Sequence, residues 1–147
     1  MCRESSGGYR FLEHVSDAYL EAWGKSLENA FEWAAKAMFE IITDTSKVRP
    51  EVEVVVSDVG TDVYNALYKW LEDLLIEHQS SNLVFSRFKV DYIKKSGDTY
   101  VFRGHAWGEP FDLSKHESRI EVKAVTYSLM EVKRRGDLWY VRVVLDI

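Results

Sequence analysis

The stretch Leu27-Glu28-Asn29-Ala30-Phe31-Glu32-Trp33-Ala34-Ala35-Lys36-Ala37-Met38-Phe39-Glu40-Ile41-Ile42 decides the fold of this chain. Its apolar residues recur at offsets of three and four, and they predict one continuous helical face. That face consists of Leu27, Ala30, Phe31, Ala34, Ala35, Met38, Phe39 and Ile42. Ser26 is the candidate N-cap. The charged residues between the apolar ones are expected on a solvated side: Glu28, Glu32, Lys36 and Glu40.

A second amphipathic helix is predicted after Gly60, with Thr61 or Asp58 as candidate N-caps. Its apolar face consists of Val63, Ala66, Leu67, Trp70, Leu71, Leu74 and Leu75. Alternating apolar and polar residues predict strands in the rest of the chain. These strands cover residues 9–14, 19–23, 51–57, 88–92, 100–107, 120–124, 130–132 and 139–145. The order predicts an α+β fold with two helices packed on one largely antiparallel β-sheet.

Length and composition are those of an ordinary globular protein. The chain has 147 residues and a net charge of −5, and we expect one domain over residues 9–147 after a flexible leader over residues 1–8. The net negative charge argues against a protein that binds a nucleic-acid phosphate backbone over a long footprint, although it is compatible with a local basic patch. The single cysteine, Cys2, allows no internal disulfide, which fits a reducing compartment. No apolar run reaches the roughly 18 residues that span a bilayer, so we expect a cytoplasmic protein without membrane contact.

The standard signatures of catalysis and nucleotide binding are absent from the sequence. It has no Walker A loop, no GxGxxG, no HExxH, no CxxC and no GxSxG. No pair of carboxylates has a spacing that by itself indicates acid–base chemistry. These absences favour a protein that is not an enzyme.

The first candidate site is Glu13-His14-Val15-Ser16-Asp17, which places three ionisable groups in five residues. As a loop it could offer carboxylate oxygens to a hard cation, or a histidine for proton transfer. The alternative is a polar hairpin turn in which Asp17 or Ser16 accepts bonds from backbone N–H groups. The residues alone leave both interpretations open.

The second candidate is the end of the sequence, where the side chain of Asp146 and the α-carboxylate of Ile147 lie close together. A cation would hold two such repelling groups in place. The alternative is an ordinary frayed terminus. The strongly apolar strand that runs up to Leu145 argues against fraying.

The third candidate is the stretch Gly108-Glu109-Pro110-Phe111-Asp112-Leu113-Ser114-Lys115-His116-Glu117, with Lys123 after it. It could be a loop that binds a partner or a ligand and carries one basic residue near a strand edge. It could equally be a solvated crossover loop.

Taken together, several of these stretches make the sequence resemble the archease family nearly end to end, from residue 9 to residue 147. The stretches that carry the resemblance are Phe11-Leu12-Glu13-His14 with Asp17, Ser26-Leu27-Glu28-Asn29-Ala30-Phe31, Ala37-Met38-Phe39-Glu40, Leu71-Glu72-Asp73-Leu74-Leu75, Gly108-Glu109, Lys115-His116-Glu117, Glu121-Val122-Lys123-Ala124-Val125-Thr126-Tyr127 and Asp146-Ile147. Each stretch alone is weak, and the combination is specific.

The resemblance implies a site as well as a fold. In the family, an aspartate of the first motif and the last two residues bind a divalent cation, often calcium, which places Asp17, Asp146 and Ile147 in that role here. Such an oxygen-only set also suits magnesium or manganese. The functionally needed lysine of the family corresponds to Lys123. The remaining candidates for contact with a partner or a nucleotide are His14, Glu13 and His116.

One difference from the family lies in the first motif. Archeases more often have Thr-Ala-Asp after the histidine, followed by Ile or Val and then Gly, whereas this chain has Val15-Ser16-Asp17-Ala18-Tyr19. The aspartate is kept and the glycine is lost.

The resemblance also implies a function. Archeases assist the RtcB-type tRNA-splicing RNA ligase: they speed formation of its guanylylated histidine and support multiple turnover, without being the ligase. The expected partner is therefore that ligase, with tRNA reached only through it. The alternative that the family suggests is a chaperone-like modulator of a tRNA cytosine-5 methyltransferase.

Overall fold

The computed structural model describes residues 6–13 and 17–147. This part of the chain folds into two α-helices, one short 3-10 helix and eight strands. The elements are β1 (Gly8–Leu12), β2 (Ala18–Gly24), α1 (Leu27–Ile42), η1 (Thr45–Lys47), β3 (Val52–Gly60), α2 (Val63–Ser81), β4 (Leu83–Ser96), β5 (Thr99–Pro110), β6 (Ala124–Val125), β7 (Glu131–Arg135) and β8 (Leu138–Asp146). The predicted α+β class is confirmed.

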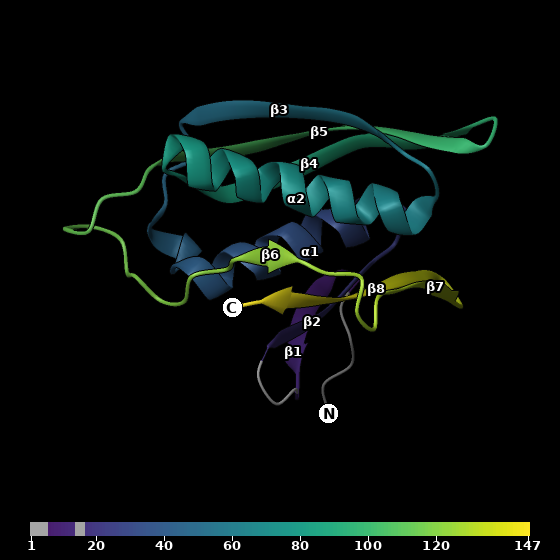
Figure 1. Cartoon of the computed structure of the whole chain (residues 1–147), viewed down its shortest axis with the longest axis horizontal. Helices are drawn as coiled ribbons and strands as arrows, with labels where there is room; N and C mark the ends of the chain where they lie inside the picture. The colour runs from purple at the N-terminus through teal and green to yellow at the C-terminus, as the bar shows by residue number, and fades with distance from the viewer. Residues whose placement is uncertain (1–5, 14–16) are drawn as a thin grey trace.

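The strands form two antiparallel sheets with both helices between them (Figure 1). One sheet, which we call the middle sheet because its strands come from the middle of the sequence, has the order β3-β5-β4. The terminal sheet has the order β1-β2-β8-β6, with β7 also paired to β8. The sequence predicted a single sheet. Two are needed because α1 packs against β2 on one side and β4 on the other, and a helix buried on both sides cannot be covered by one sheet.

Helix α1 begins as predicted. The Ser26 hydroxyl accepts a 3.0 Å hydrogen bond from the backbone N–H of Asn29, which satisfies one of the unpaired donors at the helix start. The predicted apolar face is buried from Ala30 onward. Ala37 and Ile41 lie outside that face and are buried too. The helix is covered by strands of the terminal sheet as well as by β4 of the middle sheet, so more than one of its faces is buried.

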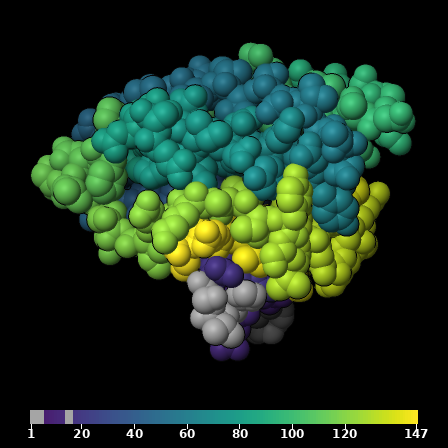
Figure 2. Space-filling view, in the orientation of Figure 1, coloured from purple at the N-terminus to yellow at the C-terminus, as the bar shows by residue number. Residues whose placement is uncertain are grey.

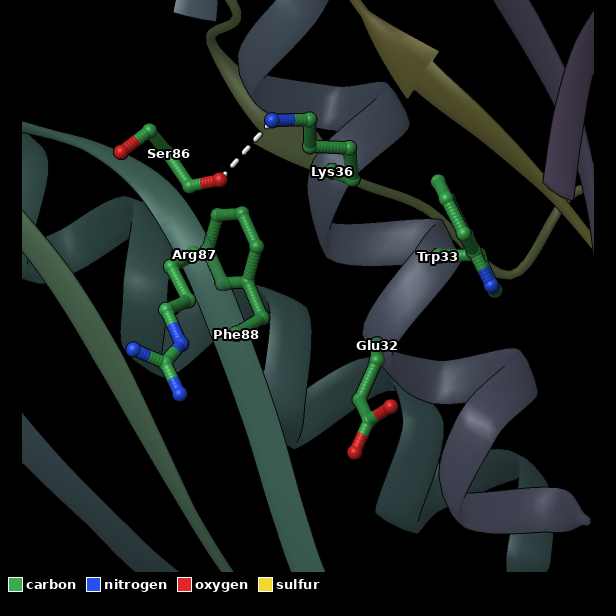
Figure 3. Close-up of a pocket in the computed structure, with 6 residues that line it drawn as sticks. All are labelled: Glu32, Trp33, Lys36, Ser86, Arg87 and Phe88. Atoms are coloured by element: carbon green, nitrogen blue, oxygen red, sulfur yellow. Dashed lines mark hydrogen bonds between the residues drawn. The ribbon is translucent and has the colours of Figure 1, made fainter. Parts of the chain in front are cut away.

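The charged stripe of α1 is not the solvated face that the sequence predicted. Glu28, Glu32 and Lys36 are only half exposed, and their side chains reach the backbone at the open edge of β4. Glu32 accepts a 2.7 Å bond from the N–H of Val90, and Glu28 accepts a 3.0 Å bond from another β4 N–H. Lys36 donates to the carbonyl oxygen of Ser86 at 2.8 Å (Figure 3). These side chains therefore form hydrogen bonds with the edge of β4 that a neighbouring strand would otherwise form.

Helix α2 has a different N-cap from the two that were predicted. Asp62, rather than Thr61 or Asp58, accepts a 2.8 Å bond from the N–H of Asn65. The Asn65 side chain in turn accepts a 3.0 Å bond from the N–H of Thr61, so the two ends of this turn satisfy each other. The apolar face is buried as predicted at Ala66, Leu67, Trp70, Leu71, Leu74 and Leu75.

The strand predicted over residues 120–124 is reduced to Ala124–Val125. Ile120, at the start of the predicted strand, is 49% exposed, whereas Val122 is buried. The backbone before β6 lies against the end of α1: the N–H groups of Arg119 and Ile120 donate 3.1 Å bonds to carbonyl oxygens of its last turn. Those bonds satisfy helix acceptors instead of extending the sheet.

Residues 1–5 of the predicted leader lie outside the described residues. Its last residue, Gly8, already belongs to β1 and pairs with Trp23. Within the described ranges, neither helix combines the length and apolar character that crossing a membrane requires.

Candidate functional site

The two ends of the sequence meet in the terminal sheet. Strands β2 and β8 pair antiparallel, with Ala18 opposite Leu145. Asp17 and Asp146 are the next residues outward along the two strands, directly beyond this last pair of the ladder. The C-terminal residues lie at the surface against the N-terminal hairpin (Figures 1 and 2). The fold therefore brings two of the predicted site residues to one sheet end, although the sequence separates them widely.

Lys123 lies at the same end, on the other side of β8. Its backbone N–H donates a 2.7 Å bond to the carbonyl oxygen of Asp146, and the following residue, Ala124, pairs with Asp146. The carbonyl oxygen of Lys123 also accepts a 3.5 Å bond from Gln79 on α2. With its backbone held on both sides, Lys123 presents an exposed ammonium beside the end of β8.

A hollow of about 480 Å³ opens beside these strand ends, and we call it the terminal groove. Asp17 and Ile147 both line it, together with Phe11, Leu12, Ala18, Tyr19, Glu40, Ile41, Arg119 and Ile120. Most of this lining is apolar. Its charged residues come from three segments that are far apart in the sequence, the first hairpin, the end of α1 and the stretch before β6.

The donor set suits a hard cation in its chemistry. Asp17 and Asp146 each carry a side-chain carboxylate, and the family resemblance predicts a third carboxylate at Ile147. Oxygen is the donor that calcium and magnesium prefer. Within residues 6–13 and 17–147, no three or more His, Cys, Asp or Glu side chains are grouped so as to hold a metal. A cation at this end of the sheet would therefore need water or a partner to complete its ligands.

The other residues of the first motif are less informative. His14 lies outside the described residues. Glu13 is exposed and comes directly after β1, in the same hairpin connection as Asp17. A contact between either side chain and a partner stays a prediction.

His116 is buried, and both of its ring nitrogens are bonded, one within its own loop and the other to the end of β5. Nδ1 accepts a 2.9 Å bond from the N–H of Asp112, which leaves the proton on Nε2. Nε2 then donates to a carboxylate oxygen of Glu109 at 2.8 Å. The ring thus fastens the loop to the end of β5. Its predicted contact with a partner stays a prediction, and such a contact would require the loop to open.

Glu109 is the acceptor around which this loop is built. The same oxygen also accepts from the Lys115 ammonium at 2.6 Å and from the Arg49 N–H at 2.9 Å. Burial alone would raise the pKa of Glu109, but these hydrogen bonds outweigh it and hold the pKa at about 2. Sequence reasoning missed this role, because the donors come from separate segments and no local pattern marks the acceptor.

Glu21 is a second buried carboxylate that no sequence pattern indicated. It lies on β2 with 2% of its side chain exposed, between Arg10 of β1 at 2.7 Å and Arg142 of β8 at 2.8 Å. Hydrogen bonding to Glu21 raises the pKa of Arg142 above its ordinary value. The cluster ties together the three strands that position Asp17 and Asp146.

Comparison with known proteins places these features in a family context. The model of the archease protein family matches residues 9–147. A protein archease from Aeropyrum pernix is 43% identical over 141 residues, which cover 96% of this chain and 98% of that protein. One from Pyrococcus furiosus is 42% identical, with 95% and 98% covered.

Two solved structures are also similar. The solution structure of protein 1598 of Methanobacterium thermoautotrophicum has a TM-score of 0.84 and 41% identity, and the match covers 95% of this chain and 99% of that one. A crystal structure from Thermotoga maritima, described as an archease and possible chaperone, has a TM-score of 0.58 and 22% identity, with 100% and 98% covered. At that identity it supports the fold alone.

Proposed function

Because this chain belongs to the archease family, we propose that it is an accessory protein that activates an RtcB-type tRNA-splicing RNA ligase. It promotes guanylylation and multiple turnover of the ligase in the cytoplasm, and it is not itself catalytic. The observation that carries the proposal is the meeting of Asp17, Asp146 and Lys123 at one end of the terminal sheet. An acidic pair with one lysine beside it suits contact with a metal- and nucleotide-dependent enzyme.

Asp17, Asp146 and the carboxylate of Ile147 are the residues that would hold a divalent cation. Calcium is our first choice, with magnesium or manganese as alternatives. When bound, the cation would supply positive charge that attracts phosphate oxygens. The three carboxylates would bind the cation at the end of the paired strands β2 and β8, where a partner can reach it.

Lys123 contributes a fixed positive point charge. Bonds to Asp146 and Gln79 hold its backbone, so the exposed side chain starts from a defined position. An ammonium suits a nucleotide phosphate or an acidic group on the ligase. Glu13, directly after β1, would flank the same contact, and we propose a contact with the partner for His14 as well.

The charge of the whole chain fits this partner. A net charge of −5 complements an RNA-binding enzyme, whose surface must be basic, and such complementarity speeds association and favours the correct orientation. This protein would then need no long contact with tRNA of its own. It would meet tRNA only through the ligase.

Guanylylation of the cognate ligase tests the proposal. The ligase should be guanylylated faster with this protein present, and Asp17→Ala, Asp146→Ala and Lys123→Ala should each lower the stimulated rate by about tenfold, which corresponds to about 1.4 kcal/mol in the activation free energy. Asp98→Ala, in the exposed β4–β5 turn, is the matched control. If all three variants stimulate like wild type, the site is wrong.

The terminal carboxylate needs a separate test. One glycine added after Ile147 moves that carboxylate while leaving both aspartates in place. We expect lower stimulation and weaker calcium binding by calorimetry. Unchanged values for both would remove Ile147 from the ligand set and leave Asp17 and Asp146 in it.

The alternative function is a chaperone-like modulator of a tRNA cytosine-5 methyltransferase. This alternative rests on membership of the archease family, which suggests it beside ligase activation. The test is the site specificity of tRNA methylation with and without this protein. Improved specificity that survives Asp17→Ala and Asp146→Ala would favour this alternative over ligase activation.

A further inference from the structure

We propose that the terminal groove is the docking site for a segment of the ligase that carries an apolar side chain next to a basic one. This inference rests on the proposed function and adds the surface that holds the partner. It assigns affinity to the groove, whereas the proposed function assigns stimulation to the strand-end carboxylates and Lys123.

The apolar side chains that line the groove favour an apolar ligand. Phe11 and Ile120 are each 49% exposed, and both line the hollow. Leu12, Ala18 and Ile41 complete an apolar surface around them. Large exposed apolar side chains around a concave surface favour an inserted apolar side chain, because each contact removes area from water on both partners.

The charged residues that line the groove favour a basic side chain next to the inserted apolar one. Asp17 and Glu40 line the groove, and Arg119 is its one basic lining residue in the described part of the chain. The Arg119 guanidinium is held 2.7 Å from Glu117 and 3.3 Å from Glu40. The carboxylates of Glu117 and Glu40 thus hold the one guanidinium. The lining itself carries two carboxylates, Asp17 and Glu40, against that single guanidinium, so it has an excess of negative charge. A lysine or arginine beside the inserted side chain would complement it.

The position of the groove links docking to the proposed activity. Asp17 and Ile147 line the groove and also belong to the proposed cation site. A segment seated in the groove is therefore held directly beside the end of β8, where Lys123 is bound to Asp146. Anchoring there would place the neighbouring surface of the ligase against the strand ends.

The terminal groove differs from a smaller hollow that lies between α1 and β4. The hollow of about 250 Å³ between α1 and β4 is lined by Glu32 and Lys36 (Figure 3), whose polar atoms are already bonded to the backbone of β4. A ligand there would compete with the bonds that cover the edge of the sheet. The terminal groove offers apolar surface that makes no such bonds.

The test is a titration of the ligase with this protein, following both guanylylation and direct binding by calorimetry. Phe11→Ser with Ile120→Ser should raise the half-maximal concentration and the dissociation constant by about tenfold or more, at an unchanged maximal rate. Val59→Ser, at an apolar residue of the middle sheet that is 46% exposed, is the matched control. Lys123→Ala, outside the groove lining, should instead lower the maximal rate. Asp17→Ala should lower the maximal rate and also weaken binding, because Asp17 lines the groove as well.

A pair of single variants tests the basic part of the proposal and does not depend on how well the double variant folds. Ile120→Lys and Ile120→Glu remove the same apolar side chain with opposite charge. Ile120→Lys should weaken binding several-fold more than Ile120→Glu, and low salt should widen the difference. Equal effects would exclude a basic segment.

The outcomes separate the two proposals. Wild-type stimulation with an unchanged half-maximal concentration in the groove variants overturns the docking site and leaves the proposed function standing. A wild-type protein that neither binds nor stimulates the ligase overturns both.

Discussion

The carboxylate of Glu32 on α1 accepts a 2.7 Å hydrogen bond from the backbone N–H of Val90, a residue of β4 that is 1% exposed. A helix side chain thus replaces the strand that would otherwise pair with the edge of the middle sheet. Open sheet edges invite pairing with other chains. The charged stripe of α1 therefore protects the protein from such pairing and also positions the helix.

Replacing Glu32 by alanine should destabilise the protein. The Val90 N–H would lose its partner at a buried position, which costs about 1–3 kcal/mol. Urea denaturation measures the change in the free energy of unfolding. Glu77→Ala, at a half-exposed glutamate of α2, is the control and should change that free energy by less than about 0.5 kcal/mol. Equal effects of the two variants would contradict the role of Glu32.

Asp58 of β3 and Asp73 of α2 share a hydrogen bond and hence a proton. Burial, reinforced by the bond and the charge of Asp58, raises the pKa of Asp73 to about 7. Burial alone would raise the pKa of Asp58 as well, but the bonds from Asp73 and from the Val59 N–H lower it below its ordinary value. The contact between α2 and β3 therefore contains a group that titrates near neutral pH.

Asp73→Asn should change how stability depends on pH. Between an ordinary pKa of 3.8 and about 7, folded Asp73 holds a proton that the unfolded chain has released. Stability therefore falls as pH rises through this window. Asparagine cannot ionise and can still donate to Asp58. The free energy of unfolding of the variant, relative to wild type, should rise from pH 5 to pH 8.

Urea denaturation at the two pH values measures this difference. Asp98→Asn, in the exposed turn between β4 and β5, should show none of it. A relative stability of Asp73→Asn that is the same at both pH values would show that Asp73 has an ordinary pKa.

Glu109→Gln should loosen the loop that follows β5. The folded pKa of Glu109 is about 2, against an ordinary 4.5, so its contribution to stability is full above pH 4.5 and is lost as pH falls to about 2. At pH 7 the variant should be less stable by about 2 kcal/mol, the scale of hydrogen bonds to a charged group. The difference in stability between the variant and wild type should be smaller at pH 3.

Thermal unfolding at pH 7 and pH 3 provides the measurement for Glu109. Glu117→Gln, whose side chain is 58% exposed, serves as the control. Hydrogen exchange adds a local reading, because the N–H of Asp112 should lose protection in Glu109→Gln once His116 is no longer held. Retained protection would place the stability of the loop elsewhere.

Glu21→Gln should weaken the terminal sheet, because Arg10 and Arg142 would lose their shared carboxylate. We expect a loss of about 2 kcal/mol, again the scale of hydrogen bonds to charged groups. Glu51→Gln, at an exposed glutamate 3.6 Å from Arg49, should cost less than about 0.5 kcal/mol. Chemical denaturation decides; a loss at Glu21 no larger than that at Glu51 would contradict the prediction.

Both helices could be predicted because their signals are local. The 3–4 spacing of apolar residues and the hydroxyl of Ser26 act within a few residues of one another. The division of the strands into two sheets could not be predicted, since strands of either sheet show the same alternation. Ala37 carried the available hint: a small residue on the polar side of α1 indicates close packing on that side as well.

The candidate site was only partly predictable. From the residues alone, Asp17 could belong to a turn and Asp146 to a frayed end, and only the family resemblance joined them. The register of β2 and β8 shows that they share one strand end. The structural roles of Glu109 and Arg119 were not predicted, because their partners lie on distant segments, where periodicity carries no information. Whether the carboxylates bind a cation stays a prediction.

The pairing of β2 with β8 also sets an order of events during synthesis on the ribosome. Helix α1, helix α2 and the β4–β5 hairpin depend mainly on neighbouring residues, and they can form while the chain is still emerging. The terminal sheet cannot be completed before β8 has emerged, because β2 lies between β1 and β8 and pairs with β8 from Ala18 to Gly24. Asp17 and Asp146 therefore come together only after β8 has been made, and a chain cut short before β8 would lack this strand end.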